Sequence, residues 1–196
     1  MTRLLLASKS AARRRMLEAA GVPFETVDAD VDEVALKAQL AHLDAPALAQ
    51  ALADAKALAA QATSEALVLG SDQVLELEDG TMLSKAASRE ELADQLRRMS
   101  GRTHRLHSAA AIAQSSKIAW RGAESVAMTM RPLSEDIIRA YLEAEFDEVR
   151  LSVGGYHAEG RGVQLFERID GSHFAVLGMP LLPLLAYLRE RGMLAS

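Results

Sequence analysis

The apolar residues at the start of the chain form short continuous runs separated by polar turns. Residues 3–7, RLLLA, predict a short strand that is buried on both faces. Residues 11–20 predict a helix, which Gly21 closes because glycine readily adopts the backbone conformation found just past a helix C-terminus. Residues 24–28 predict a second strand, so we expect the chain to open with a strand–helix–strand unit.

Helical and extended patterns then alternate. The alanine-rich residues 34–61 predict helical structure that Pro46 divides, because an interior proline removes a hydrogen bond and clashes with the preceding turn. Residues 66–77 predict an apolar strand, followed by a turn at EDG and a short return through residues 82–83. Glycine and aspartate in that turn are typical of a tight connection.

Capping signals define the next helix. Ser88 and Glu91 have the spacing of a capping box, which predicts a helix that begins there and reaches Met99. The sequence SGRTH then predicts a loop. Residues 105–113 and 117–130 predict a pair of strands joined as a hairpin across QSSK.

The last third of the chain predicts two more helices. Ser134 precedes two acidic residues and caps a helix that carries apolar residues on one face. The glycine-rich residues 154–162, GGYHAEGRG, come next, and after a short strand region a final helix begins at Pro180. The alternation of strands and helices, with a hairpin in the middle, predicts an α/β fold with a mixed sheet.

Length and composition are those of a globular protein with one domain over residues 1–196. The net charge of −5 argues against a general nucleic-acid or anionic-membrane binder, although a local basic pocket fits it. The absence of cysteine excludes disulfides, thiol nucleophiles and cysteine-ligated zinc. The apolar run 174–188 is interrupted by glycine and proline and is shorter than the ~20 residues that a membrane span needs. We therefore expect a cytoplasmic protein with no targeting segment.

The first candidate site is the junction between the opening strand and helix. Ser8 and Ser10 place hydroxyl and backbone N–H groups at a helix N-terminus, which favours anions. Arg13, near the first turn, adds a guanidinium that can bind two phosphate oxygens at once. A solvated arginine face with Ser10 as a plain cap explains the same residues.

Four further places carry candidate chemistry, each with a plainer alternative. Asp72 interrupts an apolar strand, where a buried carboxylate needs a partner such as a metal ion, a lysine or an activated water, but it also fits a strand-end cap. The carboxylates of residues 28–33, DADVDE, suit Mg²⁺ or a solvated loop. Lys85 lies near a turn, and Glu159 lies among glycines that let backbone approach a ligand. These two equally fit a surface lysine and an irregular loop.

The histidines and the standard loop motifs point to no chemistry. His104 and His107 are three apart in a predicted strand, so they face opposite sides and make a poor metal pair. The sequence has no G-x-S-x-G elbow and no Walker A loop.

Taken in order, the candidate segments resemble the Maf-like nucleoside triphosphate pyrophosphatases over nearly the whole chain. The family pattern L-A-S-x-S-P-R-R corresponds to LASKSAAR, and its V-D-E and S/A-D-T/Q-V patterns correspond to VDE and SDQV. Its G-K-P turn corresponds to SKA around Lys85, and SGRTH follows. The matching segments are residues 6–13, 31–33, 71–74, 84–86, 100–104, 154–160 and 178–180.

The resemblance implies an elongated mixed β-sheet with flanking helices, and two lobes around a cleft. It also implies a homodimeric enzyme that cuts a nucleoside triphosphate between the α and β phosphates with a divalent cation, Mg²⁺ or Mn²⁺. Asp72 would be the general base, and Glu33 and Asp72 would hold the metal. Ser8, Arg13 and Lys85 would hold phosphates together with Glu33. These roles suit phosphoryl chemistry, which needs distributed positive charge and an aligned water.

Three positions are associated with base choice within the family. Here they are Ala12, Gln73 and Glu159, and the last two are of the 7-methyl-GTP type rather than the dTTP/UTP type. A glutamate accepts the paired N1–H and N2–H₂ donors of guanine, which uracil lacks. The chain departs from the family pattern at Ala11, Ala12, Ser84 and Ala86. We therefore expect a 7-methyl-GTP pyrophosphatase; the alternatives are a dTTP/UTP pyrophosphatase and a non-catalytic nucleotide-binding regulator of cell division.

Overall fold

A computed structural model describes residues 3–60 and 65–195 of the chain. The strands are β1 (Leu4–Ala7), β2 (Glu25–Thr26), β3 (Leu67–Leu77), β4 (Met82–Leu83), β5 (Thr103–Gln114), β6 (Lys117–Met130) and β7 (Phe166–Asp170). The α-helices are α1 (Ala11–Ala19), α2 (Glu33–Gln39), α3 (Ala45–Ala59), α4 (Arg89–Met99), α5 (Glu135–Val149), α6 (His173–Val176) and α7 (Leu181–Glu190). Two short 3₁₀ helices are η1 (Val153–Gly155) and η2 (Arg161–Leu165).

The strands form one mixed sheet in the order β2-β1-β3-β5-β6-β7, with β4 paired to β3. β1 pairs in parallel with both β2 and β3, whereas β3–β4 and β6–β7 pair antiparallel. The predicted α/β class with a mixed sheet is confirmed. No helix within the described residues is long and apolar enough to cross a membrane.

The chain divides into two compact units, which we describe separately. The first comprises Met1–Gln73, Ser108–Glu124 and Ser172–Ser196, and the second comprises Val74–His107 and Ser125–Gly171. That the two units form a single domain, as expected from the sequence, stays a prediction.

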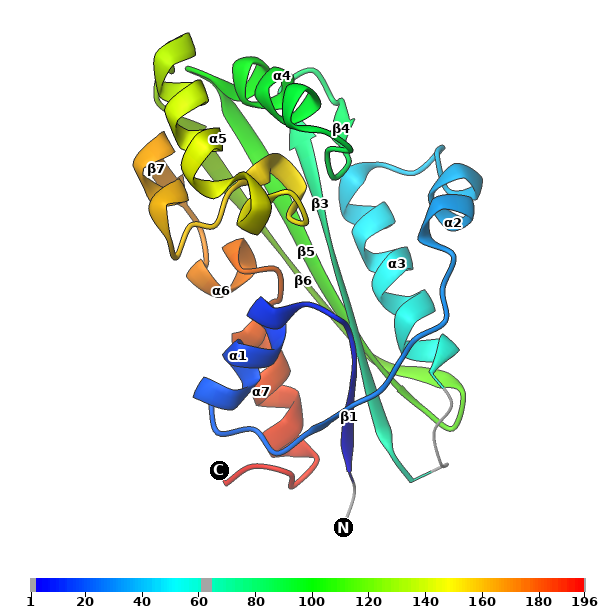
Figure 1. Ribbon diagram of the computed structural model, residues 1–196. Coiled ribbons are helices and arrows are strands. Elements are labelled where there is room, and N and C mark those ends of the chain that lie inside the picture. Colours follow the sequence, from blue (N-terminus) through cyan, green and yellow to red (C-terminus); the bar gives the residue numbers. More distant parts are fainter. Residues whose placement is uncertain (1–2, 61–64, 196) are drawn as a thin grey trace. The chain divides into compact units, whose positions relative to one another are not determined.

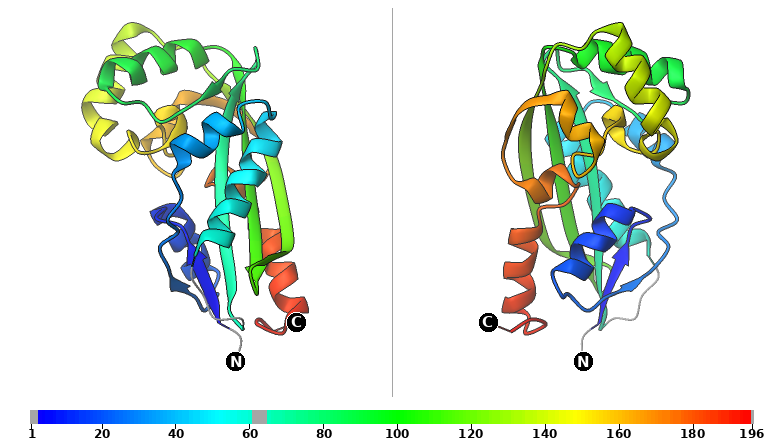
Figure 2. Two further views of the ribbon diagram at one scale, coloured as in Figure 1. Left: turned by 90° about the vertical axis from the view of Figure 1, so that its right-hand side faces the viewer. Right: turned by 60° about the vertical axis from the view of Figure 1, so that its left-hand side comes forward.

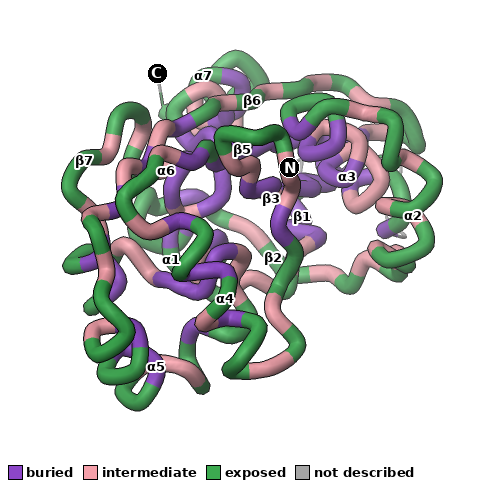
Figure 3. Tube along the Cα trace, turned by 90° about the horizontal axis from the view of Figure 1, so that it is seen from above, coloured by how far each residue is buried: buried purple, intermediate pink, exposed green. Residues whose placement is uncertain are grey.

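In the first unit the apolar core lies between the sheet and two helices. Alternate residues of β1 and β3 point to one face, where α1 and α7 lie together (Figure 1). This core includes Leu6, Leu69, Leu17, Leu184 and Leu188, all with no exposed surface. Figure 3 shows β1 as buried along its length, as its unbroken apolar sequence predicts.

Helix α3 lies on the other side of β3 in the first unit (Figure 1). Its buried residues repeat at helical spacing, and Gly70 of β3 lies directly beneath it. A Cβ atom on Gly70 would lie 2.2 Å from the backbone oxygen of Ala53 and 2.5 Å from the nitrogen of Ala57. Glycine therefore allows the helix and strand backbones to approach closely.

In the second unit α4 and α5 pack against each other (Figure 2), and η1 packs against α4. In the same unit an aromatic cluster joins the buried His104 and Tyr156 to the partly buried Phe166. His104 Nε2 lies 2.6 Å from the Tyr156 hydroxyl, and burial lowers the pKa of His104 to about 4. His107 bonds instead to Glu76 and Ser125, so the two histidines point to different surroundings, as predicted.

Local signals predicted several helix ends correctly. Ser88 Oγ accepts from the Glu91 backbone nitrogen at 3.1 Å, as in a capping box, although the Glu91 carboxylate accepts from Ala87 at 2.7 Å. Gly21 has a φ of +66°, as expected past the end of α1. The predicted hairpin turns at Ser115 and Ser116, both at positive φ.

Three boundaries differ from the prediction. The second strand has only two residues, Glu25–Thr26, instead of residues 24–28. The helical region breaks before Asp44, which caps α3, so that Pro46 occupies the first turn, where its missing N–H costs nothing. The predicted end of this region, Gln61, lies outside the described residues. The glycine-rich residues 154–162 are not wholly irregular, since η1 ends and η2 begins within them.

Candidate active site

The candidate site lies where β1 ends beside the continuing strand β3. The two strands pair in parallel, with Ala7 opposite Gly70, so Ser8 leaves the sheet next to Ser71 and Asp72. The chain turns there into α1, whose N-cap Ser10 accepts a hydrogen bond from the Arg13 backbone nitrogen at 3.4 Å. The carboxyl end of a strand and the N-terminus of a helix therefore meet at one place, as in many α/β ligand sites.

Asp72 is paired with a lysine that the sequence reasoning did not select. Lys56 Nζ lies 2.6 Å from Asp72 Oδ1 and 2.8 Å from Glu33 Oε1, so one ammonium group joins both carboxylates. Asp72 is only 6% exposed. Lys56 supplies the partner that a carboxylate buried in an apolar strand requires.

Close packing of α3 on β3 brings Lys56 to Asp72. Gly70 and Asp72 are two residues apart in β3 and therefore point to the same face, the one that α3 covers. Lys56 follows Leu52 by four residues and Ala49 by seven, so it shares their buried face of the helix. A lysine on the apolar face of an alanine-rich helix was the signal that could have revealed it.

Arg13 reaches from α1 to the backbone around Ser71. Its Nε donates to the Gly178 carbonyl at 2.8 Å, and its Nη1 donates to the Ser71 carbonyl at 2.9 Å and to Ser8 Oγ at 3.3 Å. Arg13 is 8% exposed. The predicted arginine is therefore a fixed part of the site, and the alternative of a solvated helix face is wrong for this residue.

The charges of the site act on one another. Burial lowers the pKa of the Arg13 guanidinium from its ordinary value, while the carboxylates of Asp72 and Glu33 act in the opposite direction. An arginine stays protonated under these conditions because its ordinary pKa is so high. The site therefore holds a permanent positive charge close to two carboxylates.

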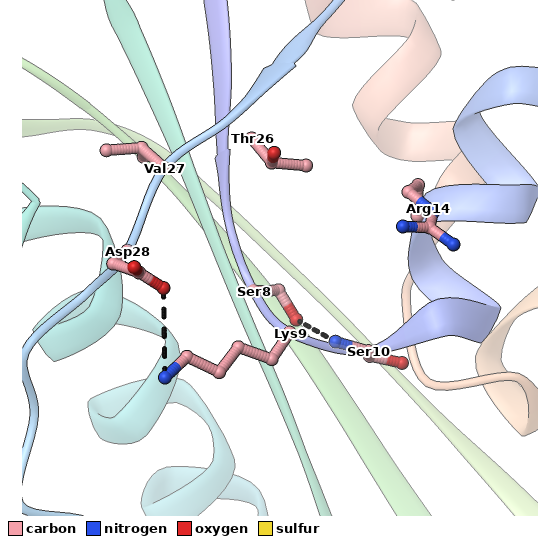
Figure 4. A pocket seen from close by; sticks show the side chains of 7 residues that line it. All are labelled: Ser8, Lys9, Ser10, Arg14, Thr26, Val27 and Asp28. Carbon is pink, nitrogen blue, oxygen red and sulfur yellow. Dashed lines mark hydrogen bonds and ion pairs between the residues drawn. The ribbon is translucent and has the colours of Figure 1, made fainter.

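Ser8 keeps a donor available at the site. Its oxygen accepts from the Ser10 backbone nitrogen at 3.3 Å and from Arg13, so its own hydroxyl hydrogen can still be donated. A polar pocket of about 330 Å³ opens beside it (Figure 4). The pocket is lined by Ser8, Lys9, Ser10, Arg14, Thr26, Val27 and Asp28.

Comparisons with known proteins show which family the chain belongs to. The family model described as "Maf-like protein" matches residues 3–191. The chain belongs to the Maf-like family. It is 48% identical to "Nucleoside triphosphate pyrophosphatase 1" of Jannaschia sp. (strain CCS1), with all of both chains covered. It is also 46% identical to "Nucleoside triphosphate pyrophosphatase" of Sphingopyxis alaskensis, covering 97% of this chain and 98% of the relative. A protein with the same name from Nitrobacter winogradskyi is 45% identical, covering 98% of this chain and 95% of the relative.

In this Maf-like protein the amide nitrogen of Gln73 is already hydrogen-bonded within the protein. Gln73 Nε2 donates toward Ala175 O at 2.9 Å, Ser108 Oγ at 3.0 Å and Val176 O at 3.1 Å. Ala12, the first predicted base-specificity residue, is partly exposed on α1. Its methyl group offers a nucleotide no hydrogen bond.

Two predicted site residues of the Maf-like protein belong to the second unit. Lys85 is exposed just after β4, and Glu159 is exposed between η1 and η2. In the first unit Ser8 bonds to Arg13, Glu33 and Asp72 share Lys56, and the charges of both carboxylates act on Arg13. The roles of Lys85 and Glu159 stay predictions.

The carboxylates of the Maf-like site fit a divalent cation with few protein ligands. Within residues 3–60 and 65–195 no three His, Asp or Glu side chains converge as a metal site. Glu33 and Asp72 do converge on a single cationic group, the Lys56 ammonium. Mg²⁺ accepts such oxygen ligands and usually completes its shell with waters and substrate phosphates.

Proposed function

We propose that this Maf-like protein, a nucleoside triphosphate pyrophosphatase, acts on 7-methyl-GTP and uses Asp72 as its general base. Water would enter and the bond between the α and β phosphates would break, giving the nucleoside monophosphate and pyrophosphate. The buried Asp72 carboxylate, held by Lys56 beside a fixed arginine, is the observation that carries the proposal.

The residues of the first unit fit the parts of this reaction. Asp72 would accept the proton of the attacking water, and Lys56 keeps its carboxylate in place. Arg13 would offer its remaining N–H groups to phosphate oxygens, and Ser8 would donate its hydroxyl hydrogen to another. Phosphoryl transfer depends mainly on such positioning and charge stabilisation, and needs no covalent nucleophile.

A divalent cation, Mg²⁺ or Mn²⁺, would be held by Glu33 and Asp72. When bound, it would neutralise negative charge on the phosphate chain. The Lys56 ammonium now links the same two carboxylates, and it would be free to turn one of its three N–H donors to a phosphate.

The base preference is supported by Glu159. A carboxylate at this position would accept the two adjacent donors of a guanine, whereas uracil and thymine cannot present such a pair. Sites that hydrogen-bond a substrate in this way reject analogues that lack the donors. The homodimer and the cytoplasmic location expected from the resemblance stay predictions.

A substrate panel with chromatographic product identification tests the function. We expect pyrophosphate release from 7-methyl-GTP to exceed that from GTP, dTTP and UTP when Mg²⁺ or Mn²⁺ is added. A dTTP or UTP preference would refute the base assignment, and nucleotide binding without hydrolysis would favour a regulator.

The role of Asp72 has its own test. Asp72→Asn should abolish turnover while the protein stays folded, because the amide cannot accept the proton. Asp44→Asn is a matched control, since Asp44 caps α3 through Oδ1 and asparagine caps helices equally well. Near-normal pyrophosphate release by Asp72→Asn would show that another group is the base.

A further inference from the structure

We infer that Gln73 and Ser108 are positioning residues for Arg13 and thereby set the strength of phosphate binding. They do so by binding the carbonyls of Ala175 and Val176, and so fixing the segment that leads to Gly178. The inference rests on the proposed function in taking Arg13 as a phosphate-binding residue.

Side chains from the sheet bind the carbonyl groups at the end of α6. Gln73 Nε2 donates to the carbonyls of Ala175 and Val176 at 2.9 and 3.1 Å. Ser108 Oγ donates to Ala175 at 2.7 Å and accepts from Gln73 at 3.0 Å. The Ala175 carbonyl also accepts from the Gly178 backbone nitrogen at 3.0 Å, so these side chains hold the turn that leads to Gly178.

The next residues include the carbonyl that holds Arg13. Gly178 O accepts from Arg13 Nε at 2.8 Å and lies 3.0 Å from Ser71 Oγ. The φ of Gly178 is +101°, and a Cβ there would lie 3.3 Å from Arg13 Nη2. The backbone thus lies directly against the guanidinium, and a shift of residues 175–178 would move Arg13 with it.

The hydrogen-bond inventory assigns both N–H groups of Gln73 to this role. An amide nitrogen carries two hydrogens, and those of Gln73 face three acceptors of the protein itself. Gln73 therefore has no N–H left for a nucleobase. Ser108 is 1% exposed, so it cannot contact a substrate, yet it supports the same carbonyl.

Inorganic tripolyphosphate is a suitable probe because it has phosphates and no base. Its Kd is measured by calorimetry for the wild type, Gln73→Met and Ser108→Ala, with thermal unfolding recorded for each. We expect both variants to weaken binding about fivefold to tenfold, the effect of losing one or two hydrogen bonds that fix Arg13. Gln50→Met is the matched control: Gln50 donates to Asp54 and to the Ala110 carbonyl, away from residues 175–178, and should change Kd less than twofold.

Two further measurements connect the effect to Arg13. In an Arg13→Lys background, Gln73→Met should add less than a twofold change in Kd, because residues in one network are not additive. With 7-methyl-GTP, GTP and UTP as substrates, each variant should raise KM by the same factor for every base.

The outcomes distinguish this inference from the proposed function. An unchanged tripolyphosphate Kd with an altered ratio of kcat/KM between bases would show that Gln73 reads the base directly. Lower thermal stability with unchanged Kd would also overturn the inference, as would absence of tripolyphosphate binding to the wild type. A wild type that binds tripolyphosphate but hydrolyses no triphosphate would refute the proposed function alone, and the comparison of Kd values would still decide the role of Gln73.

Discussion

Replacing Lys56 with methionine tests the electrostatic basis of the site. The substitution keeps most of the side-chain length but removes the ammonium group that joins Asp72 and Glu33. The side chains of Lys56 and Asp72 are 12% and 9% exposed, whereas that of Glu33 is 40% exposed. Most of the loss therefore comes from leaving the Asp72 carboxylate buried without a partner.

The expected loss of stability is large for a single substitution. Removing one partner of a buried ion pair costs about 3–5 kcal/mol. For a chain of this size that corresponds to a fall in Tm of roughly 6–20 °C. Lys9→Met is the matched control, because Lys9 pairs with Asp28 at 3.7 Å and both are well exposed. A surface pair of this kind contributes about 0–1 kcal/mol.

The assay is a double-mutant cycle in chemical denaturation. Lys56→Met and Asp72→Asn are measured singly and together, and the coupling energy is taken from the four free energies of unfolding. We expect the double variant to recover much of the stability lost in Lys56→Met, because no unpaired charge is left at position 72. A coupling energy below about 0.5 kcal/mol would refute the argument that Lys56 is the partner of a buried Asp72.

Two further predictions concern packing and pH. Gly70→Ala should lower the free energy of unfolding by about 1–3 kcal/mol and reduce turnover, because its methyl group would overlap the backbone of α3 and push Lys56 away from Asp72. Gly160→Ala is the control for the unfolding measurement, because a Cβ at that position has ordinary contacts at 3.8 Å. Burial lowers the pKa of His104 to about 4 from an ordinary 6.5, so as the pH falls the unfolded chain binds the proton before the folded protein does. The free energy of unfolding should therefore fall by about 3 kcal/mol between pH 6.5 and pH 4. His104→Gln should flatten that part of the curve of unfolding free energy against pH. An unchanged curve would show that His104 does not cause the pH dependence.

Local features were predictable because their causes lie within a few residues. The buried strand β1, the cap at Ser88 and the hairpin at Ser115 each follow from a short pattern of apolar residues or a single capping or turn signal. The misplaced break in the alanine-rich region has an equally local cause. Pro46 alone predicts an interior break, but Asp44 two residues earlier caps the helix and makes the proline a first-turn residue.

The site was only partly predictable because its geometry depends on contacts between distant segments. Arg13 and Asp72 can be identified from the sequence, since a charged side chain beside or within an apolar strand requires a partner. Lys56 did not, because its function arises only when α3 packs on β3 at Gly70. The engagement of Gln73 likewise depends on carbonyls more than a hundred residues away in the chain.

The balance of charge in the site gives a physical reason to expect metal dependence. Arg13 and Lys56 are matched by Asp72 and Glu33, so the four side chains together carry no net charge before a substrate arrives. A triphosphate brings several negative charges into this neutral cluster, next to two carboxylates that repel it. Additional positive charge must accompany the nucleotide, and a divalent cation held by those carboxylates would reverse the repulsion. We therefore expect hydrolysis to stop in EDTA and to return with Mg²⁺ or Mn²⁺. Full activity in EDTA would show that the positively charged side chains Arg13 and Lys56 suffice without a metal ion.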